Sequence, residues 1–268
     1  MGIIGAILGD ISGSQFEFHR CRNPKTAELF TKRCKFTDDT VMSLAVKYAI
    51  DHQGPPVGEL KAQIDYYSAM HEIGRKYMNS GYGRRFYKWM LDDDPDPYNS
   101  FGNGSAMRVS YVGEHFDDED RVISETAFSA MPSHNHPEGV KGAVVTAYCI
   151  WMAKHEATKQ EIFDYVLRSY PIEDYRYSIY HSLEEIRHNY KWNETCQGSV
   201  PVAMRCFYES EDYESFLRNV FSLDCDSDTL GAIGGAVAEE YYKTTGLDNE
   251  KIINTYLDDY LKNILRSH

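Results

Sequence analysis

Two short acidic strings carry the residue types best suited to chemistry in this chain. They occupy residues 37–40 (Thr-Asp-Asp-Thr) and 226–229 (Asp-Ser-Asp-Thr), far apart in the sequence. Crowded carboxylates repel one another unless a cation neutralises them, and Mg²⁺ or Mn²⁺ prefers oxygen ligands of this kind. The pattern predicts a metal site if the fold brings both strings together. For either string alone, the alternative interpretation is a helix N-cap with surface acids.

A third string, residues 102–108 (Gly-Asn-Gly-Ser-Ala-Met-Arg), has the composition of an anion-binding turn. Glycines let the backbone approach a ligand closely, and successive N–H groups at a helix start attract anions. The alternative is an ordinary turn between two helices. A metal site and a phosphate-binding turn in one chain would together suit a phosphorylated substrate.

Two further features carry ionisable side chains. His134 and His136 form a His-x-His pair, but no Cys or Asp stands at zinc-like spacing, so hydrogen bonding to phosphate or ribose competes with a structural role. Glu17 follows glycines that recur every fourth residue from Gly5 to Gly13. Its carboxylate could gate a site or act as a general base, or it could be a surface glutamate.

Composition excludes several classes of protein. The 268 residues carry a formal net charge of −13, which disfavours a nucleic-acid-binding face but is compatible with a phosphorylated small molecule. Six cysteines without a Cys-x-x-Cys pair predict free thiols in a reducing cytosol. The N-terminus lacks the features of a signal peptide, and the longest uncharged apolar stretch, 143–153, is too short to span a bilayer. We therefore expect a soluble, cytoplasmic protein.

Helical periodicity dominates the sequence. Residues 253–265 repeat apolar side chains at i, i+3 and i+4 and predict one amphipathic helix. Residues 41–50 predict a helix with Asp39 as its N-cap, and 142–155 predict a buried helix. A small-residue helix is expected at 230–242, directly after the second acidic string. Because no convincing strand occurs, we predict an all-α fold with one domain over residues 1–268.

These strings, in this order, resemble the ADP-ribosylglycohydrolase family, the metal-dependent hydrolases related to the dinitrogenase reductase-activating glycohydrolase. The resemblance extends from residue 5 to about residue 242. The matching segments are residues 9–17, 37–40, 102–108, 134–138 and 226–229, and residues 196–201 also look like shorter bacterial members.

The resemblance implies an all-α fold that holds two Mg²⁺ or Mn²⁺ ions. The implied metal ligands are Thr37, Asp38, Asp39, Asp226, Asp228 and Thr229. The implied substrate-binding residues are Gly102, Asn103, Gly104, Ser105, Ser133, His134 and His136. The implied catalytic residues are Asp38, Asp228 and Glu17, the last of these on a mobile flap beside the metals.

The implied reaction is hydrolysis of the glycosidic bond between ADP-ribose and a protein side chain or small acceptor, with release of ADP-ribose. Such bonds break through an oxocarbenium-like transition state, and paired metals can orient the sugar and activate water. The linkage stays open among arginine, serine, poly-ADP-ribose and O-acetyl-ADP-ribose, with arginine preferred. The alternatives are a catalytically silent ADP-ribose-binding module and a metal-dependent nucleotide phosphohydrolase. We expect an ADP-ribose-bearing partner, no membrane partner, and a monomer.

Three positions depart from the family pattern. Asp224-Cys225 stands where related members carry Gly-Gly, so Asp224 would join the site, repel a phosphate or point to solvent. Tyr111 replaces an expected proline, and Glu239-Glu240 replaces a late glycine of the small-residue helix. None of these changes removes an implied ligand, but they bear on substrate preference.

Overall fold

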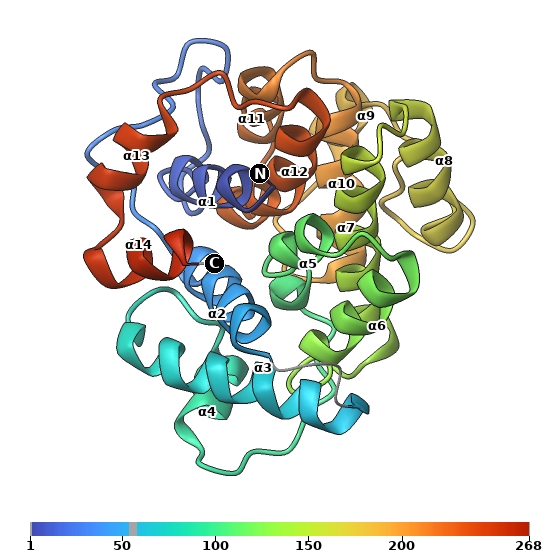
Figure 1. Ribbon diagram of the computed structural model, residues 1–268. Helices are drawn as coiled ribbons and strands as arrows, with labels where there is room; N and C mark the ends of the chain where they lie inside the picture. Colours follow the sequence, from blue (N-terminus) through green and yellow to red (C-terminus); the bar gives the residue numbers. More distant parts are fainter. Residues whose placement is uncertain (1, 54–57, 268) are drawn as a thin grey trace.

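The computed structural model describes residues 2–53 and 58–267, and these residues fold into an all-α structure (Figure 1). Within them lie fourteen α-helices and two short 3₁₀-helices, and the extended backbone forms no strand but a single bridge between Gly102 and Thr195. The all-α prediction is thus confirmed. The helices are α1 (Gly2–Gly13), α2 (Asp38–His52), α3 (Gly58–Gly74), η1 (Arg75–Tyr77), α4 (Arg84–Leu91), η2 (Asn103–Ser105), α5 (Ser110–His115), α6 (Glu119–Ala130), α7 (Pro137–Lys154), α8 (Lys159–Ser169), α9 (Leu183–Asn189), α10 (Cys196–Tyr208), α11 (Tyr213–Phe221), α12 (Ser227–Tyr242), α13 (Asn249–Tyr256) and α14 (Asp259–Arg266).

Capping residues set two helix boundaries differently from the prediction. The N-cap of α2 is Thr37, whose side chain accepts a hydrogen bond from the backbone N–H of Asp39, so Asp39 lies inside the first turn. The single amphipathic helix expected at 253–265 is two helices, α13 and α14. Asp258 separates them because its carboxylate caps α14 by accepting from the N–H of Leu261.

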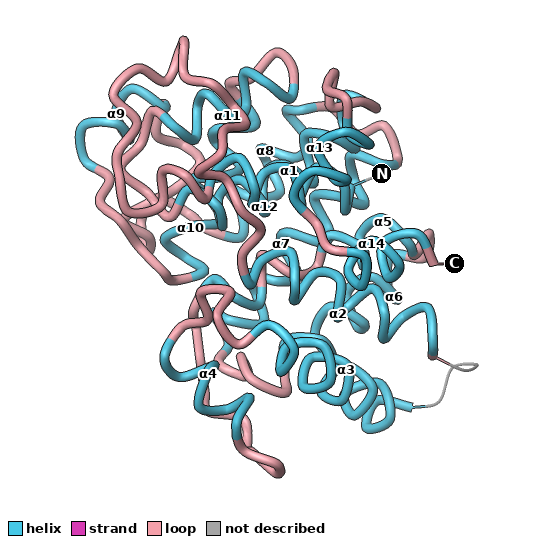
Figure 2. The backbone as a smooth tube through the Cα atoms, turned by 90° about the vertical axis from the view of Figure 1, so that its left-hand side faces the viewer, coloured by secondary structure: helices cyan, strands magenta, loops and turns pink. Residues whose placement is uncertain are grey.

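The glycines of α1 fit directly against the backbone of α12, and the two helices run antiparallel at the centre of the fold (Figures 1 and 2). A Cβ atom at Gly9 would lie 2.0 Å from the carbonyl oxygen of Gly231, and one at Gly5 would lie 2.3 Å from that of Gly235. Only glycine allows so close an approach. The four-residue glycine spacing is therefore a packing feature that brings the two helices into contact.

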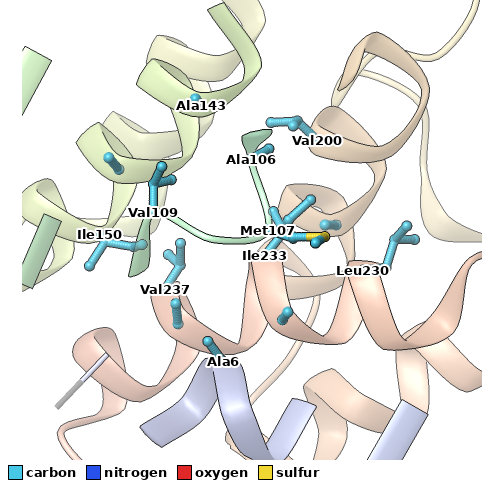
Figure 3. Packing of buried hydrophobic residues seen from close by; sticks show 14 of the residues in the cluster. Ala6, Ala106, Met107, Val109, Ala143, Ile150, Val200, Leu230, Ile233 and Val237 are labelled. Atoms are coloured by element: carbon cyan, nitrogen blue, oxygen red, sulfur yellow. The ribbon is translucent and has the colours of Figure 1, made fainter. Parts of the chain in front are cut away.

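The hydrophobic core spreads from the opposite face of α12. Figure 3 shows Ile233 and Val237 of α12 facing Val109 and Ile150, with the segment that carries Met107 passing between α12 and α7. All of these side chains are buried. The core thus holds the segment after the Gly102 turn against the same helix that begins at the second acidic string.

Three glutamates cap the N-terminus of α1. The backbone N–H of Gly2 donates to Glu240 at 2.9 Å, that of Ile3 to Glu114 at 2.9 Å, and that of Gly5 to Glu239 at 2.6 Å. Carboxylates at this position satisfy otherwise unpaired helix donors and interact favourably with the helix dipole. The acidic pair that departs from the family pattern thus supports the packing of α1 on α12.

Two expectations drawn from composition can be checked directly. All six cysteines are buried and none forms a disulfide, in agreement with the prediction of free thiols. Across residues 2–53 and 58–267, every helix is too short or too polar to cross a membrane.

Candidate active site

The two acidic strings meet at one end of the α1–α12 pair. Because these helices are antiparallel, the last turn of α1 lies beside the first turn of α12, where the hydroxyl of Ser227 donates to the carbonyl of Gly13 at 2.8 Å. Carboxylate oxygens of Asp10, Asp39 and Asp228 lie within 4.8 Å of one another, as do those of Glu17, Asp226 and Asp228. The fold therefore produces two carboxylate groups that share Asp228.

Asp10 is a member of this cluster to which the sequence assigned no role. Its carboxylate accepts hydrogen bonds from the backbone N–H groups of Thr37 at 2.9 Å and Thr40 at 3.0 Å, and from both threonine hydroxyls. Burial raises the pKa of Asp10 to about 6, although these hydrogen bonds oppose the shift. Asp10 thereby holds the start of α2 against α1. A lone carboxylate within an otherwise apolar helix was the signal that could have revealed it.

Asp38 and Asp39 project from the first turn of α2. Burial, followed by the charge of Asp10, raises the pKa of both carboxyls well above the usual range. The Oδ1 atom of Asp39 is buried and has no hydrogen-bond partner. Asp38 is half-buried. The turn at Gly81, where φ is +109°, packs close to it, since a Cβ at Gly81 would lie 3.1 Å from Oδ1 of Asp38. Within the described residues no Lys or Arg forms an ion pair with either aspartate.

Asp226 and Asp228 stand at the start of α12, and both are buried. Asp226 accepts a hydrogen bond from the side-chain amide of Asn103 at 2.8 Å. Burial raises the pKa of Asp228 well above its ordinary value, and the charges of Asp226 and Asp39 add to the effect. Asp226 and Asp228 can converge because Asp226 precedes the helix while Asp228 lies in its first turn.

Glu17 lies in the turn that follows α1, four residues beyond the last helical residue, Gly13. Its side chain is half-buried. Burial, and then the charge of Asp226, raise the pKa of Glu17 to about 7, while Lys35 opposes this shift. A carboxyl with such a pKa is suited to exchanging protons near neutral pH.

A cavity of about 320 Å³ joins these carboxylates to the glycine-rich turn. Residues of the acidic strings and of the glycine-rich turn therefore line one space. Those that line it are Glu17, Asp38, Asp39, Gly102, Asn103, Gly104, His134, Asp226, Asp228 and Thr229. Four others lie outside this lining, namely Thr37, Ser105, Ser133 and His136.

The glycine-rich turn is fixed by a second loop. The N–H of Asn103 donates to the carbonyl of Glu194 at 2.8 Å, and the N–H of Cys196 donates to that of Phe101 at 2.9 Å. The side-chain amide of Asn103 also donates to Ser199 at 3.0 Å, in addition to Asp226. Ser105 donates to the carbonyl of Gly139 at 2.7 Å, so its hydroxyl supports the turn from behind. The turn is consequently rigid, and it holds Asp226 in place.

A chain of hydrogen bonds from Arg108 through Ser133 orients the ring of His134 beside the glycine-rich turn. Arg108 donates to the hydroxyl of Ser133 at 3.0 Å, and that hydroxyl lies 2.8 Å from Nδ1 of His134. Burial, and then the charge of Arg108, lower the pKa of His134 well below its usual value, so the ring is neutral. Because Arg108 donates a hydrogen bond to the Ser133 oxygen, the Ser133 hydroxyl can donate its own hydrogen to Nδ1, and the proton of the neutral ring then lies on Nε2. Nε2 would lie 3.2 Å from a Cβ at Gly104, so glycine leaves room beside this donor.

His136 has a different position. Its ring accepts a hydrogen bond from the N–H of Glu138 and so caps α7, and its ring centre lies 5.1 Å from that of Phe101. These contacts are structural ones, although His136 was expected to bind substrate from its place in the motif.

Several residues of the cavity had no recognisable signal in the sequence. Tyr98, Arg85 and Trp192 line it, and the guanidinium of Arg85 lies 4.7 Å from the ring centre of Tyr98. Tyr98 and Trp192 come from irregular segments and Arg85 from the first turn of α4, and only tertiary contacts direct these side chains to the cavity. Asp224, by contrast, is exposed, so of the three alternatives for this residue the structure favours solvent.

Known proteins resemble this chain over nearly its whole length. A sequence profile described as ADP-ribosylglycohydrolase matches residues 1–260. The chain is 25% identical over 317 residues to ADP-ribosylhydrolase ARH3 of Gallus gallus, covering 90% of this chain and 84% of that protein. It is 23% identical over 312 residues to ADP-ribosylhydrolase ARH3 of Homo sapiens, again covering 90% and 84%.

The fold has a similar counterpart among solved structures. A chain of an "ADP-ribosylglycohydrolase-related protein complex" superimposes with a TM-score of 0.72 at 19% identity, over 98% of this chain and 92% of that one. At this identity the likeness concerns the fold alone. Together with the match of the profile over nearly the whole sequence, it leads to one conclusion: the chain belongs to the ADP-ribosylglycohydrolase family.

Proposed function

We propose that this protein hydrolyses the glycosidic bond between ADP-ribose and a protein side chain or small acceptor, and releases intact ADP-ribose. The observation that carries the proposal is the shared cavity, which is lined both by the carboxylates and by the Gly102–Gly104 turn with His134. Family membership supports the same reaction class. The cytoplasmic location and monomeric state expected from the sequence stay predictions.

The clustered carboxylates of the cavity are suited to two divalent cations, Mg²⁺ or Mn²⁺. The fit rests on the buried, unpartnered Oδ1 of Asp39 and on two carboxylate groups that share Asp228. We assign the ligands to the six residues expected from the motifs, which are Thr37, Asp38, Asp39, Asp226, Asp228 and Thr229. Asp10 is added as the residue that positions Thr37 and Thr40. When bound, such cations neutralise the carboxylates, hold sugar hydroxyls and make water more acidic.

The Gly102–Gly104 turn and His134 would hold the phosphates and the distal ribose. The N–H of Gly104 has no hydrogen-bond acceptor within the described residues, and Nε2 of His134 points toward the same turn. Together they offer two donors with no positive charge on the ring. Tyr98 and Trp192 contribute aromatic surface against which a flat base can pack.

Glu17 is the residue best placed to move a proton. With a pKa raised to about 7, its carboxyl can take a proton from the attacking water or give one to the leaving group. Asp38 and Asp228 would take part in catalysis by holding the cations that orient the sugar as its bond breaks through an oxocarbenium-like transition state. We expect Glu17→Gln to lower kcat while ADP-ribose affinity changes little, because the group acts mainly in the transition state.

The proposal is tested by a turnover panel of arginine-linked, serine-linked, poly- and O-acetyl-ADP-ribose, each with and without a chelator. We expect chelator-sensitive release of intact ADP-ribose from at least one conjugate, with the arginine linkage as the first candidate. AMP and ribose 5-phosphate as products would identify a phosphohydrolase instead. Tight ADP-ribose binding without cleavage of any conjugate would identify a silent binding module.

The metal assignment has a test that does not depend on turnover. Calorimetric titration of the metal-free protein with Mn²⁺ should show two bound ions per chain, and Mn²⁺ should raise the melting temperature. Absence of Mn²⁺ binding to the correctly folded protein would remove the cations from the proposal.

A further inference from the structure

Positive charge is concentrated in one segment of this acidic protein. Residues 19–35, which we name the basic loop, contain six Lys or Arg residues and one acidic residue, a formal charge of +5. Since the whole chain carries −13, the remainder carries −18. The basic loop begins two residues after Glu17 and ends two residues before Thr37, so it connects two parts of the candidate active site.

The basic loop covers a second cavity, of about 1060 Å³, against α9 and α11. Its lining includes Phe18, Arg20, Arg22, Lys25, Arg187 and Arg218. Arg218 fixes the loop by donating to the carbonyls of Pro24 at 2.7 Å and Ala27 at 3.2 Å, while pairing with Glu214 at 2.7 Å. The loop is therefore tied to α11 by its backbone, which leaves its own cationic side chains free to face a ligand.

Three of those side chains lack a counter-charge. Within residues 2–53 and 58–267, Arg20, Arg22 and Lys25 form no ion pair, although the protein has an excess of acidic residues elsewhere. All three are exposed. Like charges held on one short loop repel one another and attract anions from solution. The arrangement is that of an anion-binding surface.

We propose that the cavity beneath the basic loop binds an acidic peptide segment of the ADP-ribosylated protein, close to the modified residue. This inference rests on the function proposed above. The two cavities are neighbours at one point of the chain, because Glu17 lines the candidate active site and the adjacent Phe18 lines the basic cavity. A protein whose modified side chain enters the first cavity would place neighbouring residues over the second.

The shape and chemistry of the cavity favour a peptide over a nucleic acid. Phe18 is 75% exposed, and with Pro24 it offers apolar contact that peptide side chains can use. The cations sit on long side chains that suit carboxylates spread along a chain. A nucleic-acid strand carries a phosphate at every nucleotide and would extend from this patch onto a surface of opposite character, with a charge of −18.

Direct binding is the first test. The probe is a fluorescein-labelled eight-residue peptide of alternating Glu and Ala, and the readout is fluorescence anisotropy. Wild type is compared with Arg20→Glu/Arg22→Glu and with the control Arg168→Glu/Lys251→Glu, which reverses two exposed charges on α8 and α13. We expect the loop variant to bind ~10-fold more weakly and the control to bind like wild type, with weaker binding at high salt.

Equal affinity of the wild type and both variants would overturn the proposal. Stronger binding of an eight-nucleotide oligo-dT than of the peptide, lost in the loop variant, would also overturn it in favour of a nucleic-acid site. Circular dichroism on both variants confirms that each is folded, which is expected because the substituted side chains are exposed.

Kinetics separate this inference from the proposed function. The KM of the wild type should be lower for an ADP-ribosylated peptide with acidic neighbours than for one with neutral neighbours, and Arg20→Glu/Arg22→Glu should remove the difference while kcat persists. Hydrolysis of both peptides with equal KM would refute the acidic-segment site and leave the proposed function intact. Loop-dependent peptide binding without any hydrolysis would refute the proposed function and support the site.

Discussion

The two ends of the α1–α12 pair each gather several carboxylates, yet the two groups differ in what surrounds them. At the N-terminus of α1, Glu114, Glu239 and Glu240 each accept a backbone N–H. At the other end, Asp39 and Asp228 face one another, and Oδ1 of Asp39 has no donor. Acidic side chains thus satisfy the free N–H groups of a helix end in one place, and in the other they form a negatively charged site with an unpaired oxygen.

This difference indicates how structural and functional acids can be told apart. A helix N-terminus supplies donors and a favourable dipole, so the glutamates stabilise the packing. The aspartates lie at the starts of α2 and α12, but they point toward each other across the junction, where burial, and then repulsion among the carboxylates, raise their pKa values. A cluster of carboxylates of this kind needs a positively charged partner from solution, and a divalent cation is the simplest one.

Asp228→Asn should have the largest effect, because Asp228 belongs to both carboxylate groups. We expect turnover to fall ~10³-fold or more through loss of a ligand oxygen, while the metal-free protein melts at a higher temperature because repulsion is relieved. The matched control is Asp224→Asn, which changes an exposed carboxylate two residues before Asp226. Undiminished turnover of Asp228→Asn at saturating substrate would exclude Asp228 as a ligand.

Gly9→Ala tests the contact that holds both ends in register. The new methyl group would lie 2.0 Å from the carbonyl oxygen of Gly231, so the helices must separate. We expect the free energy of unfolding in urea to fall by about 2–3 kcal/mol. Gly83→Ala is the control, since no atom lies within 4 Å of its added Cβ. Equal stability of the two variants would show that the α1–α12 contact is more adaptable than its distances suggest.

Asn103→Ala removes a side-chain amide that contacts the aspartate cluster at Asp226. Because that amide donates to Asp226, we expect Mn²⁺ affinity, measured by calorimetry, to fall ~10-fold. The family resemblance implies instead that Asn103 binds substrate, which predicts that Asn103→Ala loses ADP-ribose affinity with little effect on metal binding. A variant that binds Mn²⁺ normally but ADP-ribose weakly would restore Asn103 to the role of a substrate-binding residue.

Glu239→Gln should have the smallest effect, and it depends on pH. Burial raises the pKa of Glu239 from 4.5 to about 8, with the charges of Glu114 and Glu240 adding to the shift. The folded protein therefore keeps a proton that the unfolded chain releases, so stability falls as the pH rises from about 4.5 through 8. Gln still accepts from Gly5 but does not titrate. We expect the variant to lose this part of the pH dependence in urea unfolding between about pH 4.5 and 8, and an unchanged slope would contradict the assignment.

Local patterns in the sequence predicted much of this structure, because the features concerned depend on neighbours in the chain. The all-α fold follows from apolar periodicity, which specifies a helical face wherever the core lies. Glycines at every fourth position indicated close helix packing, and the distances at Gly5 and Gly9 confirm it. Helix boundaries were less predictable, because they depend on which side-chain oxygen reaches a free backbone N–H. Thr37 and Asp258 are the residues that do so at the starts of α2 and α14.

What the sequence determined by itself is the chemical inventory: two Asp/Thr strings, a glycine turn, a histidine pair and a basic loop in an acidic chain. The tertiary structure alone decided how these parts are used. In the folded protein Asp10 binds the start of α2, and Asp224 is exposed to solvent. His136 caps a helix, whereas His134 lines the cavity. The physical reason is that burial, pairing and unsatisfied hydrogen bonds arise only when distant segments meet, and they distinguish a functional carboxylate or imidazole from a structural one.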